Sequence, residues 1–196
     1  AGPGNSSALA RLLAREGYAL HLAARDTGKL DQLARETGAV LHTCDAKDPA
    51  SVQALFDAIP GRLDVVVANP AARLRGPVAE LDPEQVRDVL EVTAFGSFLI
   101  GQQSAARMQK QEMVSGRRGT ILMTGASAGV KGFPLSAPFA MGKFAQRGLA
   151  QSMSRELHPQ GIHVVWINID GGIRNPGRTE PADRPGSMLD PDEVAR

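Results

Sequence analysis

The sequence of 196 residues contains little cysteine and few aromatic side chains, and it has no block of charge of one sign. Its single cysteine, Cys44, excludes an internal disulfide and a cysteine-rich metal site, and it is consistent with a reducing compartment. The 22 basic residues nearly balance the 21 acidic ones, which indicates no surface for nucleic acid. We therefore expect no metal ion and no nucleic acid as partners.

Long hydrophobic runs are also missing. No stretch approaches the roughly 18 apolar residues of a membrane-spanning helix, and residues 1–15 lack the apolar core of a signal peptide. We therefore expect no membrane partner and a cytoplasmic location. Apolar residues nevertheless make up 42% of the chain, which is enough for one sizeable core.

Short apolar runs alternate along the chain with segments that carry helix start and stop signals. The runs predict strands at residues 18–24, 39–44, 63–68, 121–123 and 163–169. Helices are predicted before Gly17, at 28–37, from Asp48, from Asp82 to about Met113, through Lys143 to 158, and from Asp190. This alternation is typical of an α/β fold with a parallel sheet.

The segment from Gly119 to Lys143 combines an apolar run, a loop of small residues and a helix that presents a lysine. The chain leaves the predicted strand at Gly125, and the following helix carries Phe139 and, one turn later, Lys143. An open α/β sheet builds its site in this way, at the carboxyl edge of its strands.

This layout resembles the catalytic segment of the short-chain dehydrogenase/reductase family. The resemblance covers nearly the whole chain, and it implies a Rossmann-type, doubly wound, mostly parallel sheet in a three-layer αβα arrangement. It implies one dinucleotide-binding domain over residues 1–196 that is trimmed at both ends, because the family's first strand would precede Ala1 and its last would follow Arg196.

The family reduces carbonyl groups with a tyrosine, a serine, an asparagine and a lysine, and the resemblance places only the lysine, Lys143, in this chain. Phe139 stands at the tyrosine position, Ala126 at the serine position and Thr93 at the asparagine position. Phenylalanine and alanine side chains have no proton to donate. The single tyrosine, Tyr18, lies in an early strand, so these residues do not support the usual mechanism.

Lys143 and Ser127 remain as candidate catalytic residues. The resemblance implies that the Lys143 ammonium contacts the cofactor ribose, where it would polarise an oxygen or donate a proton through water. Ser127 lies one residue past the replaced serine and would supply a hydroxyl. The alternative for Ser127 is a hydroxyl that only stabilises a tight turn.

The start of the chain resembles the phosphate-binding loop of the family. Small residues before the first helix leave backbone N–H groups at its positive end, where a phosphate binds favourably. A simple turn is the alternative. The resemblance makes Gly2, Gly4, Asn5 and Ser6 candidate cofactor-binding residues.

Arg25 follows the strand predicted at 18–24, where dinucleotide-binding folds distinguish NAD from NADP. A guanidinium pairs well with the 2′-phosphate, so Arg25 favours NADP. The neighbouring Asp26 leaves NAD open as the less favoured cofactor, and a solvated loop pair is the alternative for both residues.

Two further strand ends carry candidate cofactor-binding residues. Asp45 and Ala46 resemble the family's pair at the adenine ring, although Asp45 would serve equally well as a turn cap. Asn69, Pro70 and Ala71 stand where the family has the loop beside the adenosine ribose, and the proline makes this turn stiffer.

Two functional hypotheses follow from the resemblance. The first is an NADP-dependent oxidoreductase that uses Lys143, with water or Ser127, on an unknown small molecule carrying a CH–OH, a C=O or another activated group. The second is an NADP(H)-binding protein without dehydrogenase activity, acting as a sensor or a non-catalytic oligomer partner. The family also implies a homodimer or homotetramer, because helices like that predicted at 82–113 commonly form its dimer interface.

Overall fold

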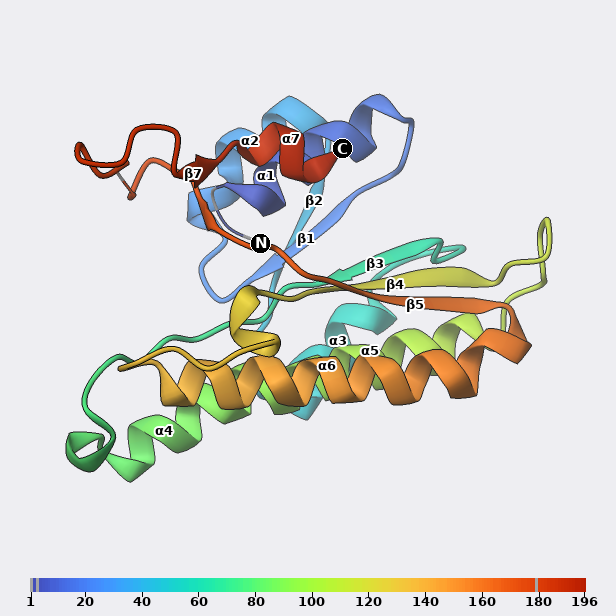
Figure 1. Ribbon diagram of the computed structural model, residues 1–196. Helices are drawn as coiled ribbons and strands as arrows, with labels where there is room; N and C mark the ends of the chain where they lie inside the picture. The colour runs from blue at the N-terminus through green and yellow to red at the C-terminus, as the bar shows by residue number, and fades with distance from the viewer. Residues whose placement is uncertain (1, 3, 179) are drawn as a thin grey trace. The chain divides into compact units, whose positions relative to one another are not determined.

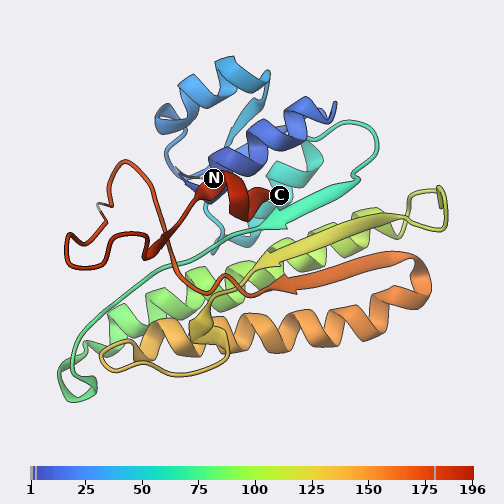
Figure 2. The same cartoon turned by 45° about the horizontal axis from the view of Figure 1, so that its top comes forward.

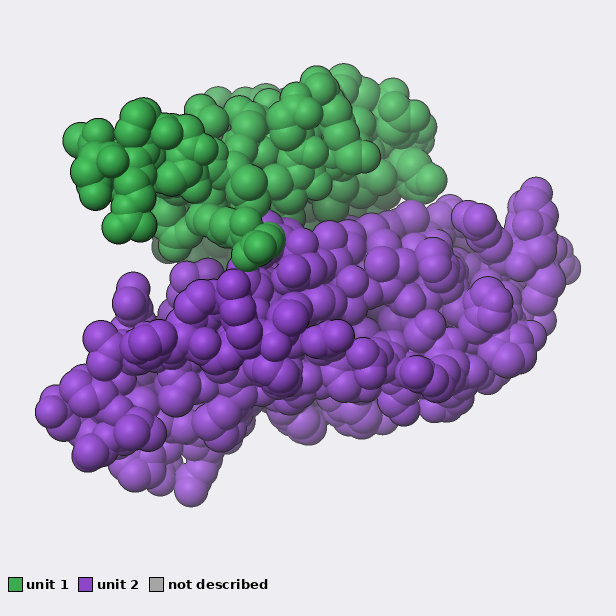
Figure 3. Space-filling view, viewed as in Figure 1, with its two compact units in different colours: residues 1–45, 170–196 green, residues 46–169 purple. Residues whose placement is uncertain are grey.

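The computed structural model describes residues 2, 4–178 and 180–196 (Figure 1). The chain forms two compact units, one from the residues up to Asp45 and from Asp170 onward, the other from Ala46 to Ile169 (Figure 3). Every paired strand within a named sheet runs parallel to its neighbour. The expectation of a parallel α/β architecture is therefore confirmed within each unit.

The first unit contains two short parallel sheets and three α-helices. Its strands are β1 (His21–Ala24), β2 (Val40–Thr43), β6 (Gly172–Ile173) and β7 (Met188–Leu189), and its α-helices are α1 (Asn5–Arg15), α2 (Asp31–Thr37) and α7 (Pro191–Ala195). β1 pairs with β2, and β6 pairs with β7. α1 packs on α2 and α7, and Ala10, Leu30 and Leu33 form its small apolar core.

The second unit is built on a three-stranded sheet with the order β3–β4–β5. The strands are β3 (Val65–Ala68), β4 (Gly119–Thr124) and β5 (Ile162–Ile167). Val66 lies opposite Ile121, which in turn lies opposite Val164. The three strands are therefore nearly level, and the loops that follow β3 and β4 leave the sheet at the same edge.

Four α-helices accompany this sheet: α3 (Pro49–Asp57), α4 (Pro83–Leu90), α5 (Gly96–Met108) and α6 (Ala137–Leu157). α5 contacts β3 and β4, and α6 contacts β5 (Figures 1 and 2). The buried side of α6 recurs every three or four residues, as expected of a helix on a sheet. Its members are Pro138, Phe139, Gly142, Lys143, Gln146, Ala150, Met153 and Leu157.

The predicted helix starts are confirmed at Asp48 and Asp82. The carboxylate of each accepts the backbone N–H two residues later, from Ala50 and Glu84 respectively, at 3.0 and 3.1 Å. A proline follows each cap in the first turn, where its missing N–H costs nothing.

The prediction of one helix from Asp82 to about Met113 is wrong. A π-helical turn, Glu91–Phe95, interrupts it, and the last helical residue is Met108. The helix ends here because the Gln111 side chain bonds the Leu63 backbone before β3. It accepts from the Leu63 N–H at 2.6 Å and donates to its carbonyl at 3.1 Å.

The loop after β4 passes closely over the indole ring of Trp166. A Cβ atom on Gly125 would lie 2.2 Å from a ring carbon, and one on Gly129 would lie 2.6 Å from another. Only glycine fits at such an approach, so the small residues of this loop have a packing role beside any functional one. In the described ranges no helix is long and apolar enough to cross a membrane.

Candidate functional site

Lys143 points from α6 into the interior of the second unit, and only 3% of its surface is exposed. Its Nζ donates to the Thr124 carbonyl at 2.7 Å and to Oε1 of Gln146 at 3.1 Å. An ammonium has three N–H donors, and these contacts use two of them. The lysine is thus fixed at the carboxyl end of β4 with one donor for a further acceptor.

Burial lowers the pKa of Lys143 from 10.5 to about 8, and the charge of the Arg73 guanidinium lowers it further in the same direction. Burial acts because the charged ammonium is poorly solvated there, and the arginine acts by like-charge repulsion. A group with a pKa near 8 exchanges a proton readily close to neutral pH, which is the property that acid–base catalysis requires.

A chain of hydrogen bonds extends from Lys143 across the unit. Gln146 donates through Nε2 to the Ser97 hydroxyl at 2.9 Å, and that hydroxyl donates to the Thr93 carbonyl at 2.6 Å. The Thr93 hydroxyl accepts the backbone N–H of Ala72 at 3.0 Å. Three elements, α6, α5 and the loop after β3, are connected in this way.

Sequence reasoning missed Gln146 and Ser97. Gln146 lies three residues after Lys143, so both share one face of the helix, and a second polar residue on an otherwise apolar face was a usable signal. Ser97 gave no such signal, because its partner is 49 residues away in sequence.

Thr93 has a structural role at the family's asparagine position. It is fully buried, and a Cβ atom on Gly142 would lie 2.9 Å from its side chain. Its hydroxyl accepts from Ala72 and so fixes the loop after β3 against the π-helical turn.

Phe139, at the family's tyrosine position, is buried with 6% of its surface exposed. The Arg73 guanidinium carbon lies 4.2 Å from the centre of its ring, and Lys143 Nζ lies 6.0 Å from it. Sequence reasoning missed Arg73, since it follows the loop Asn69–Ala71 and the resemblance assigns nothing to it. The ring therefore lies between groups of positive charge and has no proton to donate.

The structure brings Asn69 close to Lys143 through Thr124. The Thr124 hydroxyl donates to Oδ1 of Asn69 at 2.5 Å, while its carbonyl accepts from Lys143. Pro70 is buried and Ala71 is exposed in the same loop. The predicted ribose-side residues and the retained lysine therefore belong to one site in the second unit.

Ser127 begins a short 3₁₀ helix, Ser127–Gly129, that packs on α6. Its side chain is half-buried, and its backbone N–H donates to the Ile169 carbonyl at 3.3 Å. Ser127 is thus on the element next to the Lys143 helix, and its catalytic role stays a prediction.

The predicted phosphate-binding residues lie at the start of α1, in the first unit. Gly4 caps the helix without a side chain, and no acidic residue occupies the first turn. Ser7 Oγ donates to the Gly2 carbonyl at 3.0 Å, whereas Oδ1 of Asn5 is buried without a hydrogen-bond partner among the described residues. A helix start with exposed N–H groups and an unsatisfied amide fits a phosphate.

Arg25 and Asp45 follow two paired strands, because Ala24 of β1 lies opposite Thr43 of β2. Arg25 is exposed, whereas Asp26 accepts from the Gly28 N–H at 3.1 Å and pairs with Lys29 at 3.1 Å. Asp26 is thus engaged in its own turn. The two units meet in the chain between Asp45 and Ala46.

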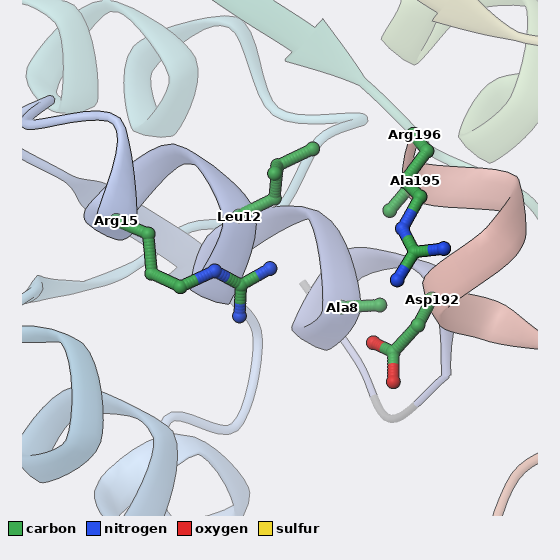
Figure 4. Close-up of a pocket in the computed structure, with 6 residues that line it drawn as sticks. All are labelled: Ala8, Leu12, Arg15, Asp192, Ala195 and Arg196. Carbon is green, nitrogen blue, oxygen red and sulfur yellow. The ribbon is translucent and has the colours of Figure 1, made fainter.

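A cavity of about 490 Å³ lies between α1 and α7 (Figure 4). It is lined by Ala8, Leu12, Arg15, Asp192, Ala195 and Arg196. None of the predicted site residues lines it. Across residues 2, 4–178 and 180–196, no group of three or more His, Cys, Asp or Glu residues could hold a metal ion.

Comparison with known families decides what this site is related to. Residues 1–179 match the family model described as short chain dehydrogenase. The chain belongs to this family. The resemblance inferred from the Gly119–Lys143 segment is therefore confirmed, and the Rossmann-type α/β fold with parallel sheets is confirmed with it.

Individual short-chain dehydrogenases with similar sequences act under several names. The chain is 30% identical over 151 residues to 17-beta-hydroxysteroid dehydrogenase type 1 of Homo sapiens, which covers 76% of this chain and 44% of that protein. It is 29% identical over 165 residues to L-2,3-butanediol dehydrogenase of Corynebacterium glutamicum, covering 78% of this chain and 61% of that protein. The chain thus spans about half the length of such relatives.

Solved short-chain dehydrogenase structures give the same result. A short-chain dehydrogenase from Rhodopseudomonas palustris is 31% identical, with a TM-score of 0.78, and the match covers 96% of this chain and 82% of that one. An alcohol dehydrogenase from Thermococcus sibiricus complexed with 5-hydroxy-NADP is 26% identical, with a TM-score of 0.81, covering 98% and 83%.

The lowered pKa of Lys143 predicts a distinct pH dependence of stability. The unfolded chain holds this proton up to about pH 10.5 and the folded chain only to about pH 8, so raising the pH between these values favours the folded state. Relative to Lys143→Met, the wild-type free energy of unfolding should rise by something on the order of 3 kcal/mol. Urea unfolding of both proteins at pH 7.5 and pH 10 measures this difference. Parallel pH profiles would contradict it.

Proposed function

We propose that the protein is an NADP-dependent oxidoreductase of the short-chain dehydrogenase family in which Lys143 is the principal catalytic residue. The observation that carries the proposal is the state of this side chain: buried, hydrogen-bonded to Thr124 and Gln146, and with its pKa lowered to about 8. Burying an ammonium costs several kcal/mol, so a lysine kept in this place is expected to have a function.

The proposed cofactor-binding residues fit a dinucleotide in each unit separately. The start of α1 would hold its phosphates, and Arg25 would bind the 2′-phosphate, because Asp26 is already engaged with Gly28 and Lys29. The complete proposed set is Gly2, Gly4, Asn5, Ser6, Arg25, Asp45, Ala46, Asn69, Pro70, Ala71 and Lys143. The bound cofactor would supply or accept the hydride. A similar structure, from Thermococcus sibiricus, was solved with 5-hydroxy-NADP.

The chain's own part of the reaction is the handling of charge and protons at the substrate oxygen. Lys143 holds a proton that it is able to pass on through water, and its third N–H donor would polarise the oxygen. Ser127, on the neighbouring 3₁₀ helix, would add a hydroxyl donor. Since the loss of one general acid typically costs about 10²- to 10⁴-fold in rate, we expect slow turnover with ordinary ketones.

Phe139 favours a second candidate function, an NADP(H)-binding protein without dehydrogenase activity that acts as a sensor or a non-catalytic oligomer partner. Its buried ring replaces the proton donor of the family, and Ala126 replaces the serine hydroxyl. Cofactor oxidation that disappears in Lys143→Ala would decide for the enzyme.

NADPH is expected to bind at least about 10-fold more tightly than NADH, because a guanidinium–phosphate bond is charge-assisted. Arg25→Gln should remove this preference, while Arg35→Gln, a change of another exposed arginine in the first unit, should leave it intact. Quenching of the lone Trp166 and calorimetry measure both affinities. Equal affinities for the two cofactors in the wild type would contradict the proposed role of Arg25.

We further propose a homodimer or homotetramer in the cytoplasm. Exposed aromatic and thioether side chains support association: Phe95 and Phe98, whose rings stack 6.1 Å apart, and Met141 and Phe144 on α6. The free thiol of Cys44 is consistent with the reducing location.

Phe98→Glu should shift the protein toward monomers, because it places a charge in the proposed interface. Val78→Glu, which changes a side chain that is 78% exposed elsewhere in the same unit, is the control and should not do so. Sedimentation velocity measures the species present. A wild type that is monomeric at all concentrations would refute the assembly.

A further inference from the structure

We propose that Arg73, held over the Phe139 ring beside Lys143, binds a carboxylate of the substrate, and that the substrates are therefore oxo acids and the corresponding hydroxy acids. The reacting carbonyl of this proposal rests on the proposed oxidoreductase function. The carboxylate site does not, because all three residues belong to the second unit and are in place without a cofactor.

The backbone beside Arg73 is fixed. Asn69 Oδ1 accepts from the Thr124 hydroxyl at 2.5 Å, and the Ala72 N–H donates to the Thr93 hydroxyl at 3.0 Å. The same Thr124 residue accepts from Lys143 through its carbonyl. The loop that carries Arg73 is therefore tied to the residue that orients the lysine, so the two cations are presented as a set.

The Phe139 ring supports the guanidinium without neutralising it. The guanidinium carbon lies 4.2 Å from the ring centre, within the range of a cation–π contact. Arg73 is itself exposed, whereas the ring is 6% exposed. A solvent-accessible cation is thus placed on a buried apolar surface, at the position where the family has its tyrosine.

A second cation lies close to the same ring, since Lys143 Nζ is 6.0 Å from its centre. After burial, the charge of Arg73 is the next cause of the lowered pKa of Lys143, which shows that the two groups repel each other. An anion bound to both would remove this repulsion. The replacement of a tyrosine by Phe139 excludes a phenolate as that anion.

A carboxylate suits these groups. The planar guanidinium donates two parallel N–H bonds to its two oxygens, and the ammonium contributes a point charge. Guanidinium cannot act as a general acid because its pKa exceeds about 12, so Arg73 is a specificity-determining residue and leaves proton transfer to Lys143. An ester of the same acid has lost the charge and should bind poorly.

Three probes with one aryl group separate these possibilities: benzoylformate, its neutral methyl ester, and benzoylphosphonate. Each is titrated by calorimetry into the protein, with and without saturating NADP⁺, which cannot reduce the probe. Wild-type protein should bind benzoylformate about 10- to 100-fold more tightly than the ester, which is the effect of a charge-assisted pair.

Arg73→Gln should abolish this preference and leave the affinity for the ester unchanged, and Arg73→Lys should restore it in part. Arg75→Gln, which removes an exposed arginine two residues along the same loop, is the matched control and should behave as wild type. Circular dichroism confirms that the variants are folded.

Equal affinity for acid and ester in the wild type, or an unchanged preference in Arg73→Gln, would overturn the carboxylate site. Tighter binding of benzoylphosphonate than of benzoylformate would overturn the choice of carboxylate. A protein that prefers the acid but binds no cofactor would refute the proposed oxidoreductase function and leave the carboxylate site standing.

Discussion

The hydrogen bond from the Lys143 ammonium to the Thr124 carbonyl is the contact on which the arrangement of the site depends. It joins the buried face of α6 to the carboxyl end of β4. A buried ammonium is tolerated only when its donors are satisfied, and here Thr124 and Gln146 accept from it. Through Ser97 and Thr93 the same network reaches the loop after β3. Changing one member would leave the others buried without partners.

This network also explains how a family site persists after its proton donors are lost. Phe139 keeps the volume and the apolar surface of the ring it replaces, so the packing of α6 on the sheet needs no adjustment. What changes is the chemistry presented to a ligand. Instead of a hydroxyl whose proton is shared with a lysine, the site offers two cations near one ring, Arg73 and Lys143.

Local signals in the sequence predicted much of the fold. The caps at Asp48 and Asp82 gave the helix starts, and the β-branched runs gave the positions of β3 and β5, because both depend on neighbouring residues alone. The end of α5 escaped prediction, since it is set by a bond between Gln111 and Leu63, 48 residues apart. Arg73 escaped for the same reason: its contact with Phe139 is made only after the loop and α6 have folded.

The central claim is that this chain transfers a hydride without the family's tyrosine. The most direct measurement incubates the protein with NADPH deuterated at C4 of the nicotinamide and a panel of oxo acids and neutral ketones, and weighs the products by mass spectrometry. We predict one deuterium on the carbinol carbon of a product, formed by the wild type and not by Lys143→Ala. A protein that binds NADPH but transfers no deuterium to any member of the panel would contradict the claim and identify a cofactor-binding protein without dehydrogenase activity.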